Sequence, residues 1–216
     1  MYTSAVMASC PLCSDRAGKR YCPAKGVQIC AVCCGTLREV EIDCPSSCIH
    51  LKASRSYAAE KQIPDPQLAA KIHIYDEKFL HDFSPILDAV SKSVVEERLT
   101  SPWLVDRDVI EVYKSLHTTM KTLASGIYYE SLPDGPVRIS LFRRLKTLID
   151  ELMQPDPSAD HGVLKVSEAL DVLDFLTFVA QMNSSVRPRS RGYLDWLSTM
   201  SGMPAAAEHS SGLILP

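Results

Sequence analysis

Eight cysteines lie within the first fifty residues of this 216-residue chain, and no cysteine follows them. Their order is Cys10-x2-Cys13-x8-Cys22-x7-Cys30-x2-Cys33-Cys34-x9-Cys44-x3-Cys48, and His50 stands two positions further on. A C-x2-C pair in a tight turn presents two thiolates to one ion, and zinc takes four such ligands in a tetrahedron. Because eight cysteines suffice for two complete sites, the spacing predicts a small module built around zinc.

The cysteine pattern favours a structural role for the metal. A site made only of cysteine has no open coordination position and no bound water to activate, so catalysis is disfavoured. The alternatives are disulfides, a reactive thiol or an iron–sulfur cluster. The N-terminus has no basic start, unlike a signal peptide, and no apolar run approaches the ~20 residues that cross a bilayer. We therefore expect a cytoplasmic protein with reduced cysteines and no membrane contact.

The first five cysteines and the residues between them resemble a known zinc finger. With Arg20-Tyr21-Cys22 and Gly26-Val27-Gln28-Ile29-Cys30, their spacing is similar to that of the B-box of tripartite-motif proteins, over about forty residues. The resemblance implies two zinc ions in a cross-braced arrangement. It implies a first site formed by Cys10, Cys13, Cys30 and Cys33, and a second site that begins with Cys22.

The chain departs from the B-box pattern at the second site. Lys25 stands where the family has an acidic ligand, Cys44 and Cys48 replace the closing histidines, and Cys34 is additional. We expect Cys34 to take the missing place, so that the second site is formed by Cys22, Cys34, Cys44 and Cys48. His50 is the reserve ligand if Cys34 or Cys48 is free. The Cys33-Cys34-Gly-Thr block is also similar to bacterial proteins of unknown role, which implies no function.

The elements that must carry these residues divide the chain into two parts. Residues 9–52 form the predicted binuclear zinc module, in which short hairpins hold the cysteines and Gly26 and Gly35 lie in turns. This stretch is poor in large apolar residues, so metal must supply folding energy. Residues 67–200 predict an all-α helical bundle, and the Ala-, Ser- and Gly-containing segment 203–216 predicts a disordered tail.

Apolar residues at three- and four-residue steps place the helices of the bundle. A first helix follows Gln67, and Asp82-Phe-Ser-Pro85 predicts the cap and start of a second. Asp106 or Asp108 is expected to cap a third, whose stripe runs from Val109 to Ile127. Further helices are predicted to start at Pro136, to span the very apolar residues 163–182, and to span Tyr193–Met200. We expect the helix over residues 163–182 to lie at the centre of the bundle.

Two other groups of residues suggest alternative functions. His73, Glu77 and His81 recur at four-residue steps and, with Glu96, Glu97 or His117, could form an enzymatic metal site in the bundle. The competing interpretation is a solvated helix face. The basic residues of the module and of the Arg187-Pro-Arg-Ser-Arg191 segment suggest nucleic-acid binding instead, with Tyr21 available for stacking. These basic residues are Arg16, Lys19, Arg20, Lys25, Arg38, Arg187, Arg189 and Arg191.

Charge does not decide between these functions. Residues 1–62 carry eight basic and five acidic residues, a net charge of +3, and the remainder carries −6. Neither value is extreme enough to require a nucleic-acid partner. We expect a non-enzymatic zinc protein that contacts a protein partner, with self-association possible. The alternatives are a nucleic-acid-binding regulator, an enzyme in the bundle, and a redox or zinc sensor that uses Cys34 and His50.

Overall fold

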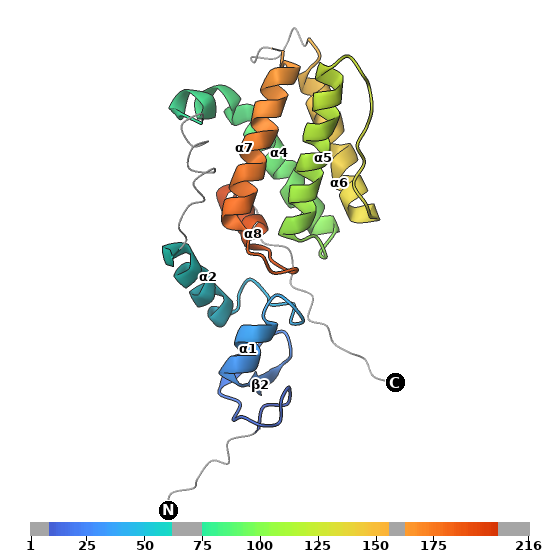
Figure 1. Ribbon diagram of the computed structural model, residues 1–216. Helices are drawn as coiled ribbons and strands as arrows, with labels where there is room; N and C mark the ends of the chain where they lie inside the picture. Colours follow the sequence, from blue (N-terminus) through green and yellow to red (C-terminus); the bar gives the residue numbers. More distant parts are fainter. Residues whose placement is uncertain (1–8, 62–74, 156–162, 203–216) are drawn as a thin grey trace, which may run out of the picture. The chain divides into compact units, whose positions relative to one another are not determined.

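The computed structural model describes residues 9–61, 75–155 and 163–202, which form two compact units (Figure 1). The first unit comprises residues 9–61 together with Arg187–Arg189, and the second comprises the other described residues. Within these ranges the chain is mostly helical, with one two-stranded hairpin near its N-terminus. The predicted succession of a small cysteine-containing module and a helical region is therefore confirmed, whereas the role of zinc is a separate question.

The first unit begins with a short antiparallel hairpin. Strand β1 (Arg20–Cys22) pairs with β2 (Val27–Ile29), so that Cys22 lies opposite Val27. The turn between them contains Gly26 at a φ of 67°, a conformation that glycine adopts without steric cost. Gly18 precedes the hairpin and lies against β2, because a Cβ atom there would be 2.7 Å from the main-chain oxygen of Gln28.

Two helices complete the first unit. Helix α1 (Ala31–Leu37) follows β2 directly, and α2 (Ile49–Lys61) follows the last cysteine. Gly35 lies within α1 rather than in the expected turn, because the chain enters a helix immediately after Cys30. One buried cluster of this unit consists mainly of cysteines together with Ile29 and Ile42, and Leu51 of α2 is also buried.

The second unit is a helical bundle. Its described helices are α4 (Glu77–Thr100), α5 (Asp106–Ala124), α6 (Pro136–Leu152), α7 (Val166–Asn183) and α8 (Gly192–Met200). Helix α5 packs against α6, α7 and α8, and α7 packs against α5, α8 and α4 (Figure 1). The largest fully buried side chains of the unit include those of Tyr113, Tyr193, Phe142 and Leu173. No helix in the described ranges has the length and apolar character needed to cross a membrane.

Helix α4 corrects the prediction that Pro85 begins a new helix. The helix starts earlier, directly after Asp76, whose Oδ1 accepts a hydrogen bond from the Phe79 amide at 2.8 Å, and it continues through Pro85. Proline cannot donate to the carbonyl four residues before it. Here the Ser84 hydroxyl donates to that carbonyl, of His81, at 3.1 Å. The side chain before the proline thus replaces the missing main-chain donor.

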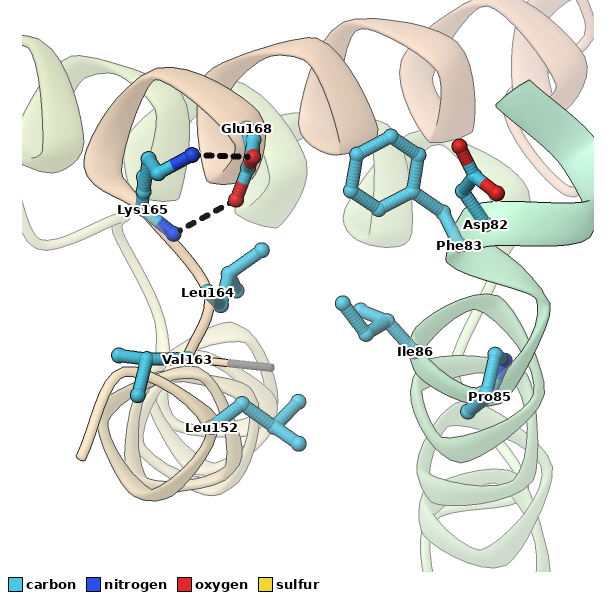
Figure 2. Close-up of a pocket in the computed structure, with 9 residues that line it drawn as sticks. All are labelled: Asp82, Phe83, Pro85, Ile86, Leu152, Val163, Leu164, Lys165 and Glu168. Atoms are coloured by element: carbon cyan, nitrogen blue, oxygen red, sulfur yellow. Dashed lines mark hydrogen bonds and ion pairs between the residues drawn. The ribbon is translucent and has the colours of Figure 1, made fainter. Parts of the chain in front are cut away.

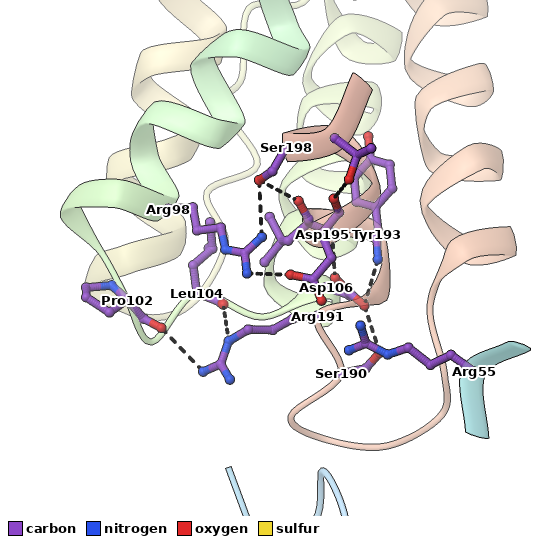
Figure 3. A network of polar contacts seen from close by, with 12 residues as sticks. Arg55, Arg98, Pro102, Leu104, Asp106, Ser190, Arg191, Tyr193, Asp195 and Ser198 are labelled. Atoms are coloured by element: carbon purple, nitrogen blue, oxygen red, sulfur yellow. Dashed lines mark hydrogen bonds and ion pairs between the residues drawn. The ribbon is translucent and has the colours of Figure 1, made fainter. Parts of the chain in front are cut away.

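Asp106 also differs from its predicted role. It is the first residue of α5, and the amide of Val105, the residue before the helix, donates to Asp108 at 3.2 Å. The buried carboxylate of Asp106 instead accepts hydrogen bonds from the Tyr193 and Leu194 amides at 3.3 and 3.1 Å (Figure 3). Asp106 therefore caps α8, which lies more than eighty residues away in the sequence.

Two further differences concern helix ends and the central helix. Helix α5 ends at Ala124, so Ile127 lies beyond it and is exposed. Helix α7 is not buried on all sides, since Phe175 and Phe178 are only half-buried. Both of these rings contact the ring of Tyr75. The predicted start at Pro136 is confirmed. The expected tail 203–216 lies outside the described residues.

Candidate metal centre

Four cysteines converge in the first unit. The sulfur atoms of Cys10, Cys13, Cys30 and Cys33 all lie within 4.8 Å of one another, a range that allows them to bind one metal ion. Cys10, Cys30 and Cys33 are buried, and Cys13 is half-buried. These are the four residues predicted for the first site. The cluster can hold one metal ion.

The first C-x2-C pair is shaped by a tight turn. The amides of Cys13 and Ser14 donate to the Cys10 carbonyl at 3.3 and 2.7 Å, and the Cys10 amide donates to the Arg16 carbonyl at 2.7 Å. Ser14 completes the turn in the left-handed region, with a φ of 56°. This turn brings both thiols of the pair into the cluster.

The second C-x2-C pair is shaped by the start of α1. Cys30 occupies the position before the helix, and its Sγ accepts a hydrogen bond from the Cys33 amide at 3.3 Å. A helix N-terminus stabilises a thiolate through its unpaired amides and its dipole. The Sγ atoms of Cys13 and Cys30, one from each pair, lie 3.9 Å apart.

Main-chain amides and neighbouring sulfurs shift the pKa values of the clustered thiols in opposite directions. Burial disfavours a charge on Cys10, but hydrogen bonds from main-chain amides lower the pKa of its thiol to about 6. The Cys33 amide also lowers the pKa of Cys30. The pKa of Cys33 is raised to about 12, first by its contact with Cys30 and then by burial. Since like charges resist full deprotonation, a divalent cation would stabilise the four thiolates together.

Arg16 lies beside this cluster. Its guanidinium pairs with Asp15 at 3.4 Å, and the pKa of Arg16 is raised first by that carboxylate and further by the Cys13 and Cys30 thiols. A cation at this position reduces the net negative charge of a site with four thiolates. In the sequence, Arg16 is a candidate for nucleic-acid binding. The cysteine spacing does not reveal the turn that brings its guanidinium close to the sulfur atoms.

The other four cysteines are all free thiols and lie outside this cluster. Cys22 ends β1, Cys34 lies on α1, and Cys48 immediately precedes α2; these three are buried, whereas Cys44 is half-buried. In the described part of the chain, no second group of three or more metal-binding side chains meets the 4.8 Å range. His50, the expected reserve ligand, is half-buried in α2. The second predicted site thus stays a prediction.

The histidine-containing candidate in the bundle gains no support from the described residues. His73 lies outside them, and Glu77 and His81 are exposed on α4. Glu96 forms an ion pair with Arg144 at 2.6 Å, and Glu97 accepts a hydrogen bond from Ser101 at 3.2 Å. His117 faces Asp174 instead, with 3.6 Å between Nε2 and Oδ1.

Several of the predicted basic contacts are directed at the protein itself. Within the first unit, the Arg187 guanidinium donates to the carbonyls of Gly35, at 3.0 Å, and Arg38. Within the second unit, the Arg191 guanidinium donates to the carbonyls of Leu104 and Pro102 at 3.2 and 3.3 Å (Figure 3). These arginines bind main-chain carbonyls at the C-terminal end of α1 and between α4 and α5.

A pocket of about 280 Å³ in the second unit is another concave feature (Figure 2). Figure 2 shows Phe83 and Ile86 of α4 facing Leu164 across it. At its rim, Lys165 and Glu168 form an ion pair at 3.3 Å, so these charges are already matched. The pocket is small for a ligand site, and its described lining residues include no convergent catalytic groups.

No protein-family model matches this chain, and no curated protein or solved structure is significantly similar to it. The B-box resemblance therefore stays a prediction from the cysteine spacing, and the function has to be inferred from the site.

Proposed function

We propose that this chain is a zinc-dependent protein-interaction protein, in which zinc bound by Cys10, Cys13, Cys30 and Cys33 holds the N-terminal module in shape. The convergence of these four sulfurs within 4.8 Å carries the proposal. Thiolates favour zinc among the common divalent ions, and four of them complete its tetrahedron. With no position left for water or substrate, the proposed centre is structural rather than catalytic.

The composition of the module's core supports a structural metal. Apart from its cysteines, the module buries only a few aliphatic side chains, which are those of Ile29, Ile42 and Leu51. Domains this small usually need a metal, disulfides or a partner subunit to be stable. Binding of a structural zinc contributes folding free energy on the order of 10 kcal/mol.

The proposed partner is a protein. Leu12 and Val32 lie inside the two C-x2-C pairs, and their side chains are 38% and 49% exposed. Tyr21 of the hairpin is 56% exposed, and the exposed Lys19 and Lys25 flank it in the sequence. Apolar side chains that a metal site holds at the surface, among polar ones, are typical of contact with another protein. The bundle would serve as a scaffold, as a surface for self-association or as a second binding face.

Nucleic-acid binding is less well supported. Arg38 is buried, Arg16 is paired with Asp15, and the Arg187 and Arg191 guanidinium groups donate to main-chain carbonyls. These contacts engage four of the eight predicted basic residues within the protein rather than at a phosphate-binding surface. A nucleic-acid complex would also weaken steeply with salt, since each phosphate contact releases counterions.

The proposal is tested by comparing Cys33→Ser with Val32→Ser in the full-length protein. Cys33→Ser should lose zinc and unfold the module, because it removes one of four ligands. Val32→Ser should keep zinc, since that side chain is exposed and is not a ligand. Zinc content and circular dichroism measure the two effects.

The interaction itself is tested by a photo-crosslinking residue in place of Val32. A discrete protein adduct in cells, absent when Cys33→Ser is added, is the expected result. Adducts with nucleic acid would favour the rival function, and zinc that survives Cys33→Ser unchanged would contradict the proposal.

A further inference from the structure

A run of exposed apolar side chains lies between α5 and α6, in residues 127–132, the connecting segment. The side chains of Ile127, Tyr128 and Tyr129 are 62%, 66% and 64% exposed, and that of Leu132 is 49% exposed. These residues belong to no helix or strand and contain no turn or bend, so the chain is extended there. Figure 1 shows the connection running back beside the helices. Apolar side chains gathered at a surface are typical of an interaction site.

Two threonines of α5 hold the connecting segment in place. The Thr122 hydroxyl donates to the Tyr129 carbonyl at 3.1 Å, and the Ser131 amide donates to the Thr119 hydroxyl at 3.0 Å. The Ile127 amide also donates to the Thr122 carbonyl at 3.0 Å. Thr119 is buried, so this anchor lies within the bundle. The segment is therefore fixed along α5 although most of its side chains are exposed.

These hydrogen bonds leave an unpaired strand edge on the other side of the segment. In an extended chain, the N–H and C=O of one residue point to the same side, and those of the next residue point to the opposite side. The Tyr129 carbonyl and the Ser131 amide both face α5, so the main-chain groups of Tyr128, Glu130 and Leu132 face away from it. Within the described residues, no hydrogen bond engages the main chain of these three. Such an edge is a template for pairing with another chain.

The side chains of this edge are complementary to a second copy of it. Tyr128 and Glu130 lie on one face of the extended chain, where the Tyr128 hydroxyl donates to the Glu130 carboxylate at 2.6 Å. The Lys146 ammonium of α6 lies 5.5 Å from the centre of the Tyr128 ring and helps to position it. If two copies run antiparallel with Tyr129 opposite Tyr129, each Tyr128 faces the Glu130 of the other copy.

This register satisfies both the main chain and the side chains. It pairs the outward main-chain groups of Tyr128 with those of Glu130 in the second copy, twice around the two-fold axis. A hydroxyl donor meets a carboxylate acceptor, and the two exposed Tyr129 rings meet at the axis. A register with Glu130 opposite Glu130 would instead oppose two carboxylates, which is unfavourable.

We propose that the connecting segment is a self-association edge, through which two copies of this chain pair as antiparallel strands around Tyr129. The inference rests on the interaction role proposed for the bundle and assigns self-association to one segment of it. It does not depend on the metal centre. The resulting dimer has two metal-binding modules, one from each copy.

The register is tested by exchanging charges at Tyr129 in the full-length protein and measuring sedimentation over a range of concentrations. Wild type should show a monomer–dimer equilibrium. Tyr129→Lys and Tyr129→Glu should each be monomeric, because like charges then meet at the two-fold axis. An equimolar mixture of these two variants should form the dimer again, because opposite charges meet. Circular dichroism should be unchanged in both, since this side chain is exposed.

A second pair of variants tests the main-chain contact. Glu130→Pro removes the outward amide, and Glu130→Ala, the matched control, keeps it; proline is tolerated at an unpaired strand edge. The proline variant should associate about 10-fold more weakly than the alanine variant, because each dimer loses two hydrogen bonds.

A wild-type protein that is monomeric at every concentration, a mixture of the charged variants that stays monomeric, or equal association of the proline and alanine variants would overturn the inference. Zinc measured in the same samples tests the metal-built module separately, so that module can stand when the self-association edge fails.

Discussion

At the scale of single residues, the C-x2-C pairs were the most informative signal in the chain. Each C-x2-C turn fixes the relation of its own two thiols, and the resemblance to a B-box implied that these two pairs converge. The spacing does not predict that Arg16 and Arg38 lie beside sulfur atoms, because these approaches depend on the local fold, such as the turn at Ser14. The remaining four cysteines illustrate the same limit, because they come from separate elements and their distances depend on packing.

One glycine of the module offers a sharp residue-scale prediction. Gly18→Ala should destabilise the module by about 1–3 kcal/mol, because the new Cβ would lie 2.7 Å from the Gln28 oxygen and force the hairpin apart. Gly35→Ala is the matched control, since no atom lies within 4 Å of its Cβ position and alanine favours a helix. The rate of zinc release to a chelator measures both. Equal rates for the two variants would show that the close approach at Gly18 is wrong.

At the scale of elements, periodicity predicted most helices of the second unit, and side-chain hydrogen bonds decided where it was wrong. Pro85 looked like a helix start, but the capping side chain at Asp76 and the Ser84–His81 contact allow α4 to run through it. Asp106 looked like a cap for the helix that follows it. Its carboxylate caps α8 instead, and sequence patterns do not predict such long-range contacts.

A double-mutant cycle tests the role of Ser84 in α4. Ser84→Ala should destabilise the second unit by about 0.5–1.5 kcal/mol, because it removes the donor to the His81 carbonyl. In the Pro85→Ala background the same change should cost much less, since the main-chain amide that this substitution introduces can donate to that carbonyl. Urea unfolding of the four proteins measures the coupling. Additive effects would contradict the compensation by Ser84.

At the scale of the whole molecule, the two units achieve stability by different means. The second unit buries aliphatic and aromatic side chains from five described helices, as an ordinary globular domain does. The first unit buries mainly cysteines and few aliphatic side chains, so we expect its stability to depend on what the cysteines bind. Removing metal should therefore unfold the first unit and leave the helices of the second intact. Both tryptophans, Trp103 and Trp196, lie in the second unit and can report on it alone.

The most direct test of the central claim is the zinc content of the purified full-length protein, measured by elemental analysis for wild type and Cys13→Ser. We predict two zinc ions per wild-type chain. Cys13→Ser should lose at least the ion of the first cluster, with tryptophan fluorescence unchanged. A wild-type protein that is folded throughout and contains no zinc, or a Cys13→Ser variant that retains all of it, would contradict a module built around zinc.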